Sequence, residues 1–293
     1  MNVFFFGMGF SSQATALAIR EIIDEDAAIF GTTRSRSRAG ELGRIGVRSH
    51  AFDGRAPGLM LAADLVRSSR VVLSIPPANG HCPVLAHHRQ DLDRIEDLEW
   101  LCYFSSVGVY DNSNGAWIDE SADLAHADER AGVRLKVEDQ WREYARERQV
   151  PLCIFRIAGI YGPGRSALDK LRDGVAHRII KKGQVFNRVH VADIGRVTAL
   201  AMSQRLDGTF NLTDDEPAPP QDLVTFAAEL LGVDPPPEIP FEEAELSDFA
   251  RQFYMDNKRV SNARIKKALG IELLFPTYRE GLRNIREQEE LPA

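Results

Sequence analysis

A glycine loop near the start of the chain has the residue types and spacing that bind a diphosphate. Gly7 and Gly9 are two residues apart, and Phe10, Ser11 and Ser12 lead into a helical pattern. Such glycines let the backbone turn sharply and approach an anion, and the helix N-terminus supplies free N–H groups. Ser12 stands where the usual fingerprint has a third glycine; it is small, and its hydroxyl could donate to a phosphate. We therefore predict a dinucleotide site, the alternative being a tight turn without a ligand.

The residues after the next apolar run indicate which dinucleotide binds. Residues 27–32 are followed by Thr33, Arg34 and Ser35, with Arg36 directly behind and no acidic residue among them. NAD-selective sites usually place Asp or Glu here for the ribose hydroxyls, whereas guanidinium and hydroxyl groups suit a 2′-phosphate. The sequence therefore favours NADP, with NAD as the other possibility. A solvated basic loop is the alternative interpretation.

Three further polar or turn-forming residues follow predicted strands. Asp53 comes after the third apolar run and could accept a hydrogen bond from the adenine amine, or it could cap a turn. Ser74 and Pro76 follow the fourth run and would form a wall beside the cofactor's ribose. Open parallel sheets bind ligands at the carboxyl ends of their strands, so all three are expected to line the cofactor site.

The elements that must position these residues alternate along the first half of the chain. Short apolar runs predict strands at 2–6, 27–32, 47–52, 71–75, 101–105 and 152–157, and helical patterns predict helices at 14–23, 59–66, 84–92 and 128–148. Apolar strands separated by helices are typical of the α/β class, here a Rossmann-type doubly wound parallel sheet.

The residue pattern changes after residue 165, where prolines separate short predicted helices such as 221–231 and 261–269. Ser261 is the expected N-cap of the latter helix and Gly270 its C-terminal stop. We predict a dinucleotide-binding Rossmann domain over 1–165. Residues 166–293 are expected to form mainly a smaller C-terminal substrate lobe, with some segments returning to the Rossmann domain.

The composition excludes several classes of protein. The formal net charge is −7, which argues against a broad nucleic-acid surface. No run approaches the roughly 20 apolar residues of a membrane span, so we expect a soluble, cytoplasmic protein. Cys82, Cys102 and Cys153 are scattered, so neither a disulfide framework nor a metal site is expected, and the last two read as core residues. His87 and His88 lie in a polar helical pattern and are expected to be solvated.

Four stretches, in this order and spacing, resemble the extended short-chain dehydrogenase/reductase family, also called the NAD-dependent epimerase/dehydratase family, in an atypical form. They are residues 7–12, 104–110 (FSSVGVY), 155–164 (FRIAGIYGPG) and 189–194 (VHVADI). The resemblance extends over nearly the whole chain. It implies a nicotinamide cofactor, a Rossmann sheet of about seven strands and a C-terminal substrate lobe.

The resemblance also implies a catalytic set of Ser or Thr, Tyr and Lys, of which only the serine is matched. Ser106 stands four residues before Tyr110, as in the family. Aligning the family's glutamate with Glu138 puts Arg134 at the lysine position and Arg130 at the tyrosine position. The usual phenol donor is therefore missing, and arginine holds its proton too tightly to replace it. Arg134 could still bind the nicotinamide ribose or a substrate anion, and Tyr110 is either a substitute acid or a packing residue.

In the family, the segment that contains Ala158 and Gly159 passes the nicotinamide end of the cofactor and lines the active-site cleft. Arg156, Tyr161 and Arg165 flank this segment and could bind a substrate carboxylate or phosphate. Arg156 could instead pair within the end of its strand.

Two ring side chains have alternative interpretations. His190 could be a general acid–base group, or it could tie down a loop ahead of a helix. Trp117 lies in a loop rich in Asn and Gly, and it could close over a substrate or anchor that loop.

These residues favour an NAD(P)-dependent oxidoreductase or epimerase-like enzyme, with NADP preferred, that acts on a small polar or sugar-derived substrate. The alternative is a non-catalytic NADP(H)-binding sensor or regulatory protein that has lost the Tyr–Lys pair. The expected partner is a small molecule, with neither nucleic acid nor membrane. Related proteins often dimerise through helices on one face of the sheet, but the sequence has no exclusive signature of a homodimer.

Overall fold

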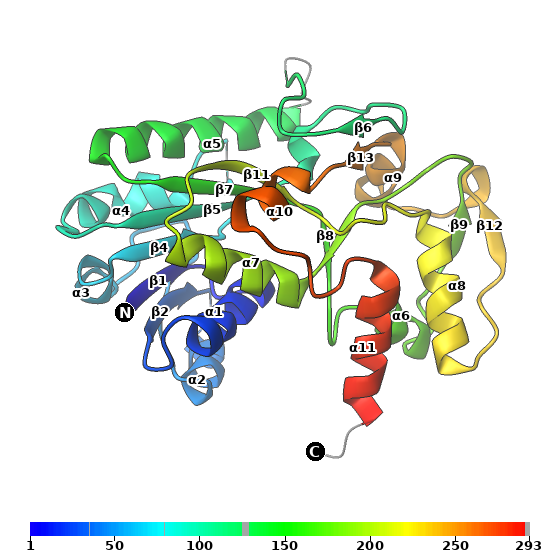
Figure 1. Ribbon diagram of the computed structural model, residues 1–293, viewed down its shortest axis with the longest axis horizontal. Helices are drawn as coiled ribbons and strands as arrows, with labels where there is room; N and C mark the ends of the chain where they lie inside the picture. Colours follow the sequence, from blue (N-terminus) through cyan, green and yellow to red (C-terminus); the bar gives the residue numbers. More distant parts are fainter. Residues whose placement is uncertain (35, 79, 125–128, 291–293) are drawn as a thin grey trace. The chain divides into compact units, whose positions relative to one another are not determined.

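The centre of the fold is a seven-stranded sheet with the strand order β11-β7-β5-β4-β1-β2-β3 (Figure 1). The structure is a computed structural model and describes residues 1–34, 36–78, 80–124 and 129–290. The strands are β1 (Asn2–Phe6), β2 (Ala28–Thr33), β3 (Val47–Ala51), β4 (Arg70–Leu73), β5 (Trp100–Ser106), β7 (Leu152–Ile157) and β11 (Gly208–Leu212). The pairings from β3 through β2, β1 and β4 to β5 are all parallel. The predicted α/β class and doubly wound Rossmann-type sheet are therefore confirmed.

Helices cover both faces of this sheet (Figure 1). They are α1 (Phe10–Ile22), α2 (Arg36–Arg44), α3 (Ala62–Val66), α4 (Pro83–Asp93), α5 (Glu129–Arg148) and α7 (Val191–Ser203), with a 3-10 turn, η1 (Val107–Val109), after β5. The apolar sides of α3, α4 and α5 pack on one face in a large core that includes Trp141. On the other face α1 and α7 approach closely, because a Cβ at Gly195 would lie only 2.6 Å from the Ala14 carbonyl oxygen.

The chain divides into two compact units: the first contains residues 1–109, 127–156 and 194–210, and the second contains residues 110–126, 157–193 and 211–293. The elements of the second unit are β6 (Trp117–Ile118), β8 (Gly159–Tyr161), α6 (Ala167–Arg172), β9 (Arg178–Ile180), β10 (Arg188–His190), α8 (Pro220–Leu231), β12 (Glu238–Pro240), η2 (Phe241–Glu243), α9 (Asp248–Met255), β13 (Arg259–Val260), α10 (Ala263–Leu269) and α11 (Tyr278–Glu290). Its strands form three parallel pairs, β10 with β8, β12 with β9 and β13 with β6.

Three predicted helix starts were wrong. Helix α1 begins at Phe10, four residues before its predicted start, so the serines of the glycine loop lie in its first turn. Helix α3 begins only at Ala62, because Met60 has a φ of 67°, which no right-handed helix accommodates. The N-cap of α10 is Asn262 and not Ser261, since the Ser261 N–H still pairs in an extended segment with the Ile118 carbonyl. Gly270 ends α10 in the left-handed conformation, as predicted.

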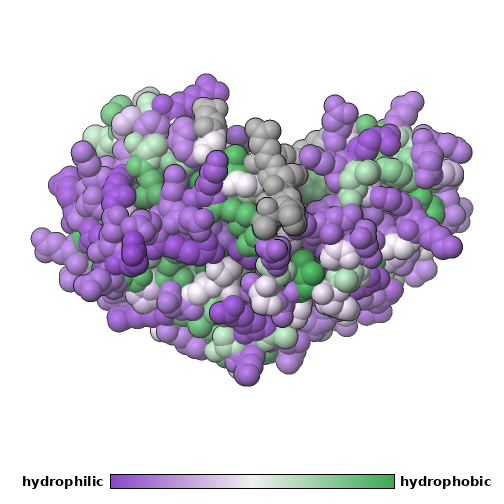
Figure 2. All heavy atoms as spheres, turned by 90° about the horizontal axis from the view of Figure 1, so that it is seen from above, coloured by the Kyte–Doolittle hydropathy of each residue, from purple (hydrophilic) through white to green (hydrophobic). Residues whose placement is uncertain are grey.

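The three cysteines lie in the interior, and the visible surface is mostly polar. Cys82, Cys102 and Cys153 are free and buried. Of the helices in the described part of the chain, none is long and apolar enough to cross a membrane. The face seen in Figure 2 is mostly hydrophilic.

Candidate functional site

The glycine loop joins β1 to α1 and is held over the carboxyl ends of neighbouring strands. Gly7 has a φ of 100°, and a Cβ at this position would lie 2.7 Å from the Ser74 hydroxyl. Its N–H donates to the Thr32 hydroxyl at 2.8 Å, and the Met8 N–H donates to the Thr32 carbonyl at 2.8 Å. Only glycine has both the conformation and the size for position 7, so β2 and the β4 loop fix the loop from both sides.

The N-terminus of α1 is open to an anion. Gly9 is its N-cap residue and supplies no side-chain hydrogen bond, and a Cβ at Gly9 would meet nothing within 4 Å. The N–H groups that open the helix therefore find no acceptor on the side chain of the N-cap residue, where a helix is normally capped. The helix dipole adds partial positive charge at the same point. This arrangement can hold a pyrophosphate.

The hydroxyl of Ser12 has a different partner from the predicted phosphate. Ser12 is buried, and its Oγ donates to the Ser74 Oγ at 3.0 Å. The Ser74 hydroxyl in turn donates to the Gly7 carbonyl at 2.6 Å. Ser12 thus ties α1 to the loop after β4 and takes the packing role of the family's third glycine.

Arg34 and Asp53 lie exposed just beyond the ends of β2 and β3. Thr33 is buried at the end of β2, and its carbonyl accepts from the Phe52 N–H at 2.9 Å. Arg34 follows it; its side chain is exposed and makes no hydrogen bond or ion pair with the described residues. Ser35 lies outside the described residues. The exposed Asp53 accepts from the Arg55 N–H at 2.9 Å through one oxygen, as a turn cap would. Pro76 is exposed beyond Ser74.

The residues at the predicted catalytic positions of the first unit have modest contacts. Ser106 ends β5, and its half-buried hydroxyl accepts from the Gly108 N–H at 3.1 Å. Arg134 is half-buried on α5. Burial raises the pKa of the neighbouring Tyr103 phenol above its usual value, and the charge of Arg134 acts in the opposite direction. Of the Ser106 and Tyr103 hydroxyls, that of Ser106 is the more accessible.

Tyr110 has a structural position in the second unit. Its side chain is 3% exposed, and its hydroxyl donates to the Asn211 Oδ1 at 2.7 Å. Its carbonyl accepts from the buried Lys258 ammonium. A phenol engaged in this way supplies no proton to a substrate, so the structure favours the packing interpretation of Tyr110.

Arg156 pairs with Glu138, which favours the alternative that it pairs within the end of its strand over a substrate contact. Its guanidinium is 3% exposed and donates to the carboxylate of the fully buried Glu138, at 3.2 Å from Nε and 2.8 Å from Nη2. Ser105 Oγ (2.6 Å) and Arg142 Nη2 (2.9 Å) donate to the same carboxylate. Burial would raise the pKa of Glu138, but these hydrogen bonds and charges outweigh it and hold the pKa below its ordinary value. The pair connects β7 to α5 and is part of the core.

Tyr161 and His190 are likewise core residues. Tyr161 is 5% exposed and packs so closely on α11 that a Cβ at Gly281 would overlap its hydroxyl, which favours a packing role over the predicted substrate contact. His190 is buried against Tyr161, and its Nδ1 accepts from the Ala192 N–H at 3.2 Å, at the start of α7. Burial lowers the pKa of His190 to about 4. The loop-anchoring interpretation of His190 therefore fits the structure.

The remaining predicted residues lie in the second unit. The N–H groups of Ala158 and Gly159 donate to the carbonyls of Leu212 and Asn187, at 3.0 and 3.1 Å. Gly159 and Arg165 are exposed. Arg165 lies in the turn that begins at Gly162, where the two residues exchange backbone hydrogen bonds. It is the one arginine of the predicted substrate set whose side chain is exposed.

Comparison with known proteins agrees with this architecture. No family model matches the sequence. A solved structure of a functionally unknown conserved protein from Silicibacter pomeroyi is 36% identical, covers 99% of both chains and has a TM-score of 0.86. Human epimerase family protein SDR39U1, solved with NADPH, is 17% identical over 98% of this chain and 99% of its own, with a TM-score of 0.70. UDP-N-acetylglucosamine 4-epimerase from Bacillus cereus is 14% identical over 99% of both chains, with a TM-score of 0.72.

A curated Streptomyces protein, 3-diazoavenalumate denitrifying reductase, is 29% identical over 140 residues, which are 44% of this chain and 45% of that protein. The matched region thus spans slightly less than half of this relative. Together, the sheet order and the open glycine loop define a Rossmann-type protein whose fold is also that of solved epimerases. The chain shares its fold with these epimerases, which agrees with its predicted resemblance to an atypical extended short-chain dehydrogenase/reductase.

Proposed function

We propose that the protein is an NADP(H)-dependent oxidoreductase that acts on a small polar substrate. The observation that carries the proposal is the pairing of an open helix N-terminus behind Gly7 and Gly9 with the exposed Arg34 at the end of β2. The first feature suits a pyrophosphate and the second a ribose 2′-phosphate. The human neighbour was solved with NADPH, which supports the same cofactor.

Different residues of the chain would bind different parts of the cofactor. The N–H groups that open α1 would bind the pyrophosphate, and Arg34 the 2′-phosphate. The free oxygen of Asp53 is oriented by its bond to Arg55 and could accept from the adenine amine. Ser74 and Pro76 would border the ribose, and Arg134 would replace the family's lysine at the nicotinamide ribose. When bound, the cofactor supplies a hydride donor or acceptor.

The absence of the family's catalytic tyrosine limits the kinds of substrate that the enzyme could reduce. Ser106 can donate a hydrogen bond to a substrate oxygen, but Arg130 stands at the position of the family's tyrosine and holds its proton too tightly to act as the acid. A substrate whose reduction leaves no alkoxide needs no such acid. The name of the Streptomyces relative describes a reduction that removes nitrogen, which is a reaction of this kind. We therefore propose a substrate with a leaving group or an activated double bond in preference to a simple ketone.

Calorimetric titration with NADPH and with NADH tests the cofactor assignment. Arg34→Ala should weaken NADPH by about tenfold to a hundredfold and leave NADH nearly unchanged, because one charge-assisted phosphate contact is lost. Arg94→Ala is the matched control, an exposed arginine just after α4, and it should change neither affinity. If Arg34→Ala weakened the affinity for NADPH and for NADH equally, the NADP preference would be contradicted. If the unmodified protein bound neither dinucleotide, the proposed function would be refuted.

A second candidate function is an NADP(H) sensor without catalysis. The bonded, buried phenol of Tyr110 and the arginine at position 134 favour it. Steady oxidation of NADPH by an added acceptor that disappears in Ser106→Ala would exclude the sensor. Tight NADPH binding with no oxidation across acceptors that need no protein acid would favour it over the enzyme.

A further inference from the structure

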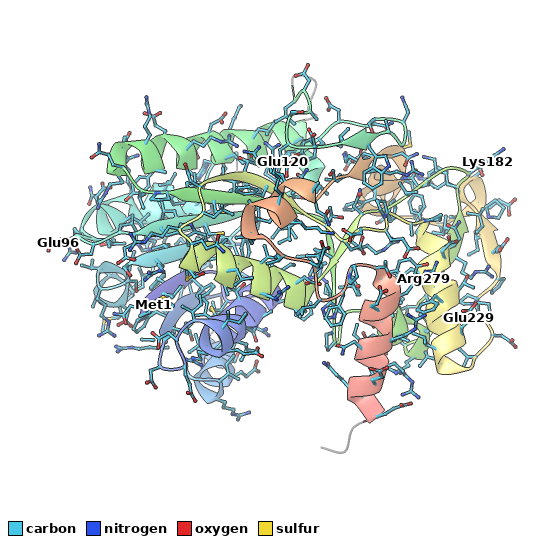
Figure 3. All side chains as sticks on the ribbon, viewed as in Figure 1. Met1, Glu96, Glu120, Lys182, Glu229 and Arg279 are labelled. Carbon is cyan, nitrogen blue, oxygen red and sulfur yellow. The ribbon has the colours of Figure 1, made fainter. Side chains whose placement is uncertain are left out.

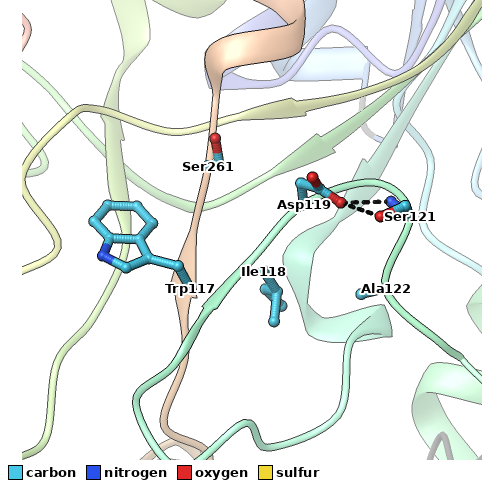
Figure 4. A pocket seen from close by; sticks show the side chains of 6 residues that line it. All are labelled: Trp117, Ile118, Asp119, Ser121, Ala122 and Ser261. Carbon is cyan, nitrogen blue, oxygen red and sulfur yellow. Dashed lines mark hydrogen bonds between the residues drawn. The ribbon is translucent and has the colours of Figure 1, made fainter.

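An open cavity of about 540 Å³ lies within the second unit, between the segment that contains β6 and the end of β13 (Figure 4). Trp117, Ile118, Asp119, Ser121, Ala122 and Ser261 line it. None of these residues has a place in the dinucleotide site or in the substrate predictions, apart from the two alternatives considered for Trp117.

The walls of this cavity are fixed before any ligand arrives. The Ser261 N–H donates to the Ile118 carbonyl at 2.8 Å, continuing the β6–β13 pair. The fully buried Asn211 links both walls, because its N–H donates to the Glu120 carboxylate at 2.6 Å and its side-chain amide donates to the Ser261 carbonyl at 3.1 Å. Glu120 is labelled in Figure 3. A wall held by such bonds loses little entropy on binding.

One side of the cavity is a bare aromatic face. The Trp117 side chain is 59% exposed and makes no ring or cation–π contact with the described residues. Trp100 and Trp141 are fully buried, so Trp117 is the exposed tryptophan of the chain. An indole exposed beside a preformed cavity offers a large flat surface, and a ring that stacks on it is stabilised because both lose contact with water.

The other side offers a fixed carboxylate. One oxygen of Asp119 accepts from the Ser121 N–H at 2.8 Å and from the Ser121 hydroxyl at 2.5 Å, and the other oxygen makes no hydrogen bond with the described residues. The two Ser121 hydrogen bonds lower the pKa of Asp119, and Arg264 makes the smallest contribution in the same direction. Asp119 is the charged residue among the six that line the cavity, and two bases of the facing segment are engaged elsewhere: Lys258 donates to the Tyr110 carbonyl and to Asp256, and Arg259 to the Gly115 carbonyl. The cavity is therefore suited to a hydrogen-bond donor and unsuited to an anion.

We propose that this cavity binds a planar ring that carries hydrogen-bond donors, stacked on Trp117 with a donor on the free oxygen of Asp119, and that it selects neutral or cationic ligands over anionic ones. Figure 4 shows Trp117 and the Asp119–Ser121 pair on either side of Ile118. The site belongs to the second unit alone and does not depend on the proposed cofactor function.

Acrylamide quenching of tryptophan fluorescence tests this site directly, because the quencher reaches Trp117 while Trp100 and Trp141 are buried. The probes are tyramine and phloretate, which present the same phenol ring on a cationic and an anionic chain. Tyramine should protect the emission saturably, and phloretate should bind at least about tenfold more weakly. Trp117→Phe should abolish the quenchable component.

Asp119→Asn is the decisive variant, since Asn can still accept from Ser121 and keep the turn while it removes the charge. It should lower the affinity for tyramine about tenfold and reduce the ratio of the tyramine affinity to the phloretate affinity. Glu242→Gln, at an exposed acid of η2, should change nothing. Absence of protection, equal protection by both probes, or protection unaffected by Asp119→Asn would overturn the proposal. The titration uses no dinucleotide, and Arg34→Ala should leave it unchanged, so its failure is separate from failure of the cofactor assignment.

Discussion

The buried pair of Glu138 and Arg156 gives the sharpest prediction about stability. Glu138 is fully buried and Arg156 is 3% exposed, and the two share two hydrogen bonds. Removal of one partner of a buried ion pair typically costs about 3–5 kcal/mol, because the other charge stays buried without compensation. After Arg156→Met the carboxylate keeps Ser105 and the part-exposed Arg142, so we expect about 3 kcal/mol, the lower end of that range.

The opposite substitution should cost more. Glu138→Gln leaves the buried Arg156 facing a neutral amide, and we expect about 3–5 kcal/mol. The double variant Glu138→Leu/Arg156→Met replaces both charges by apolar groups and should be more stable than the sum of the single changes predicts, by at least about 2 kcal/mol. Because the pKa of Glu138 is below its ordinary value, the stabilisation is present at neutral pH and is lost as the pH falls through the folded pKa.

Equilibrium urea unfolding followed by circular dichroism measures these free energies. The reasoning is refuted if Arg156→Met changes the free energy of unfolding by less than about 1 kcal/mol and the double variant is additive. An effect of Arg156→Met on substrate KM without any loss of stability would restore Arg156 as a substrate ligand.

Three further predictions concern the second unit. Tyr110→Phe leaves the buried Asn211 without a donor and should cost about 1–3 kcal/mol in urea unfolding, with NADPH affinity unchanged in the same titration used above. Burial raises the pKa of Asp214 from 3.8 to about 8. The folded protein therefore holds a proton there that the unfolded chain releases, so stability should fall as the pH rises through this window, and Asp214→Asn should remove that fall when unfolding is compared at about pH 5 and pH 8. Gly281→Ala should lower Tm, because its Cβ would overlap the Tyr161 hydroxyl at 2.1 Å; an unchanged Tm would show that the ring moves freely.

The sequence predicts the strands and the glycine loop of the first unit better than the surroundings of the residues expected to bind substrate. Five of the seven strands of the central sheet are largely apolar runs, which local pattern identifies, whereas β3 (VRSHA) has only Val47 buried. The seventh, β11, is five residues long and only its last three are buried, so it has no such run. The residues proposed to bind the cofactor lie at or just after the ends of strands, so their positions follow from those of the strands. Gly7 and Arg34 are examples.

The contacts that bury the residues predicted to bind substrate come from distant parts of the chain. Arg156 is paired by Glu138, 18 residues earlier, and Tyr161 is enclosed by α11, more than 100 residues later. His88 was expected to be solvated, but it is buried and accepts from the Gly58 N–H at 2.9 Å. No local pattern contains these partners, so burial of a polar side chain could not be predicted from its neighbours in sequence.

Binding of NADPH to Gly9→Asp tests the central claim most directly. Gly9 has a negative φ and open space around its missing Cβ, so aspartate fits without a clash, and it is also a favoured N-cap residue. The account predicts that Tm is unchanged or higher, while NADPH affinity falls by more than about a hundredfold because a carboxylate occupies the pyrophosphate position. Unchanged NADPH affinity in this stable variant would contradict the assignment of the glycine loop as the dinucleotide site.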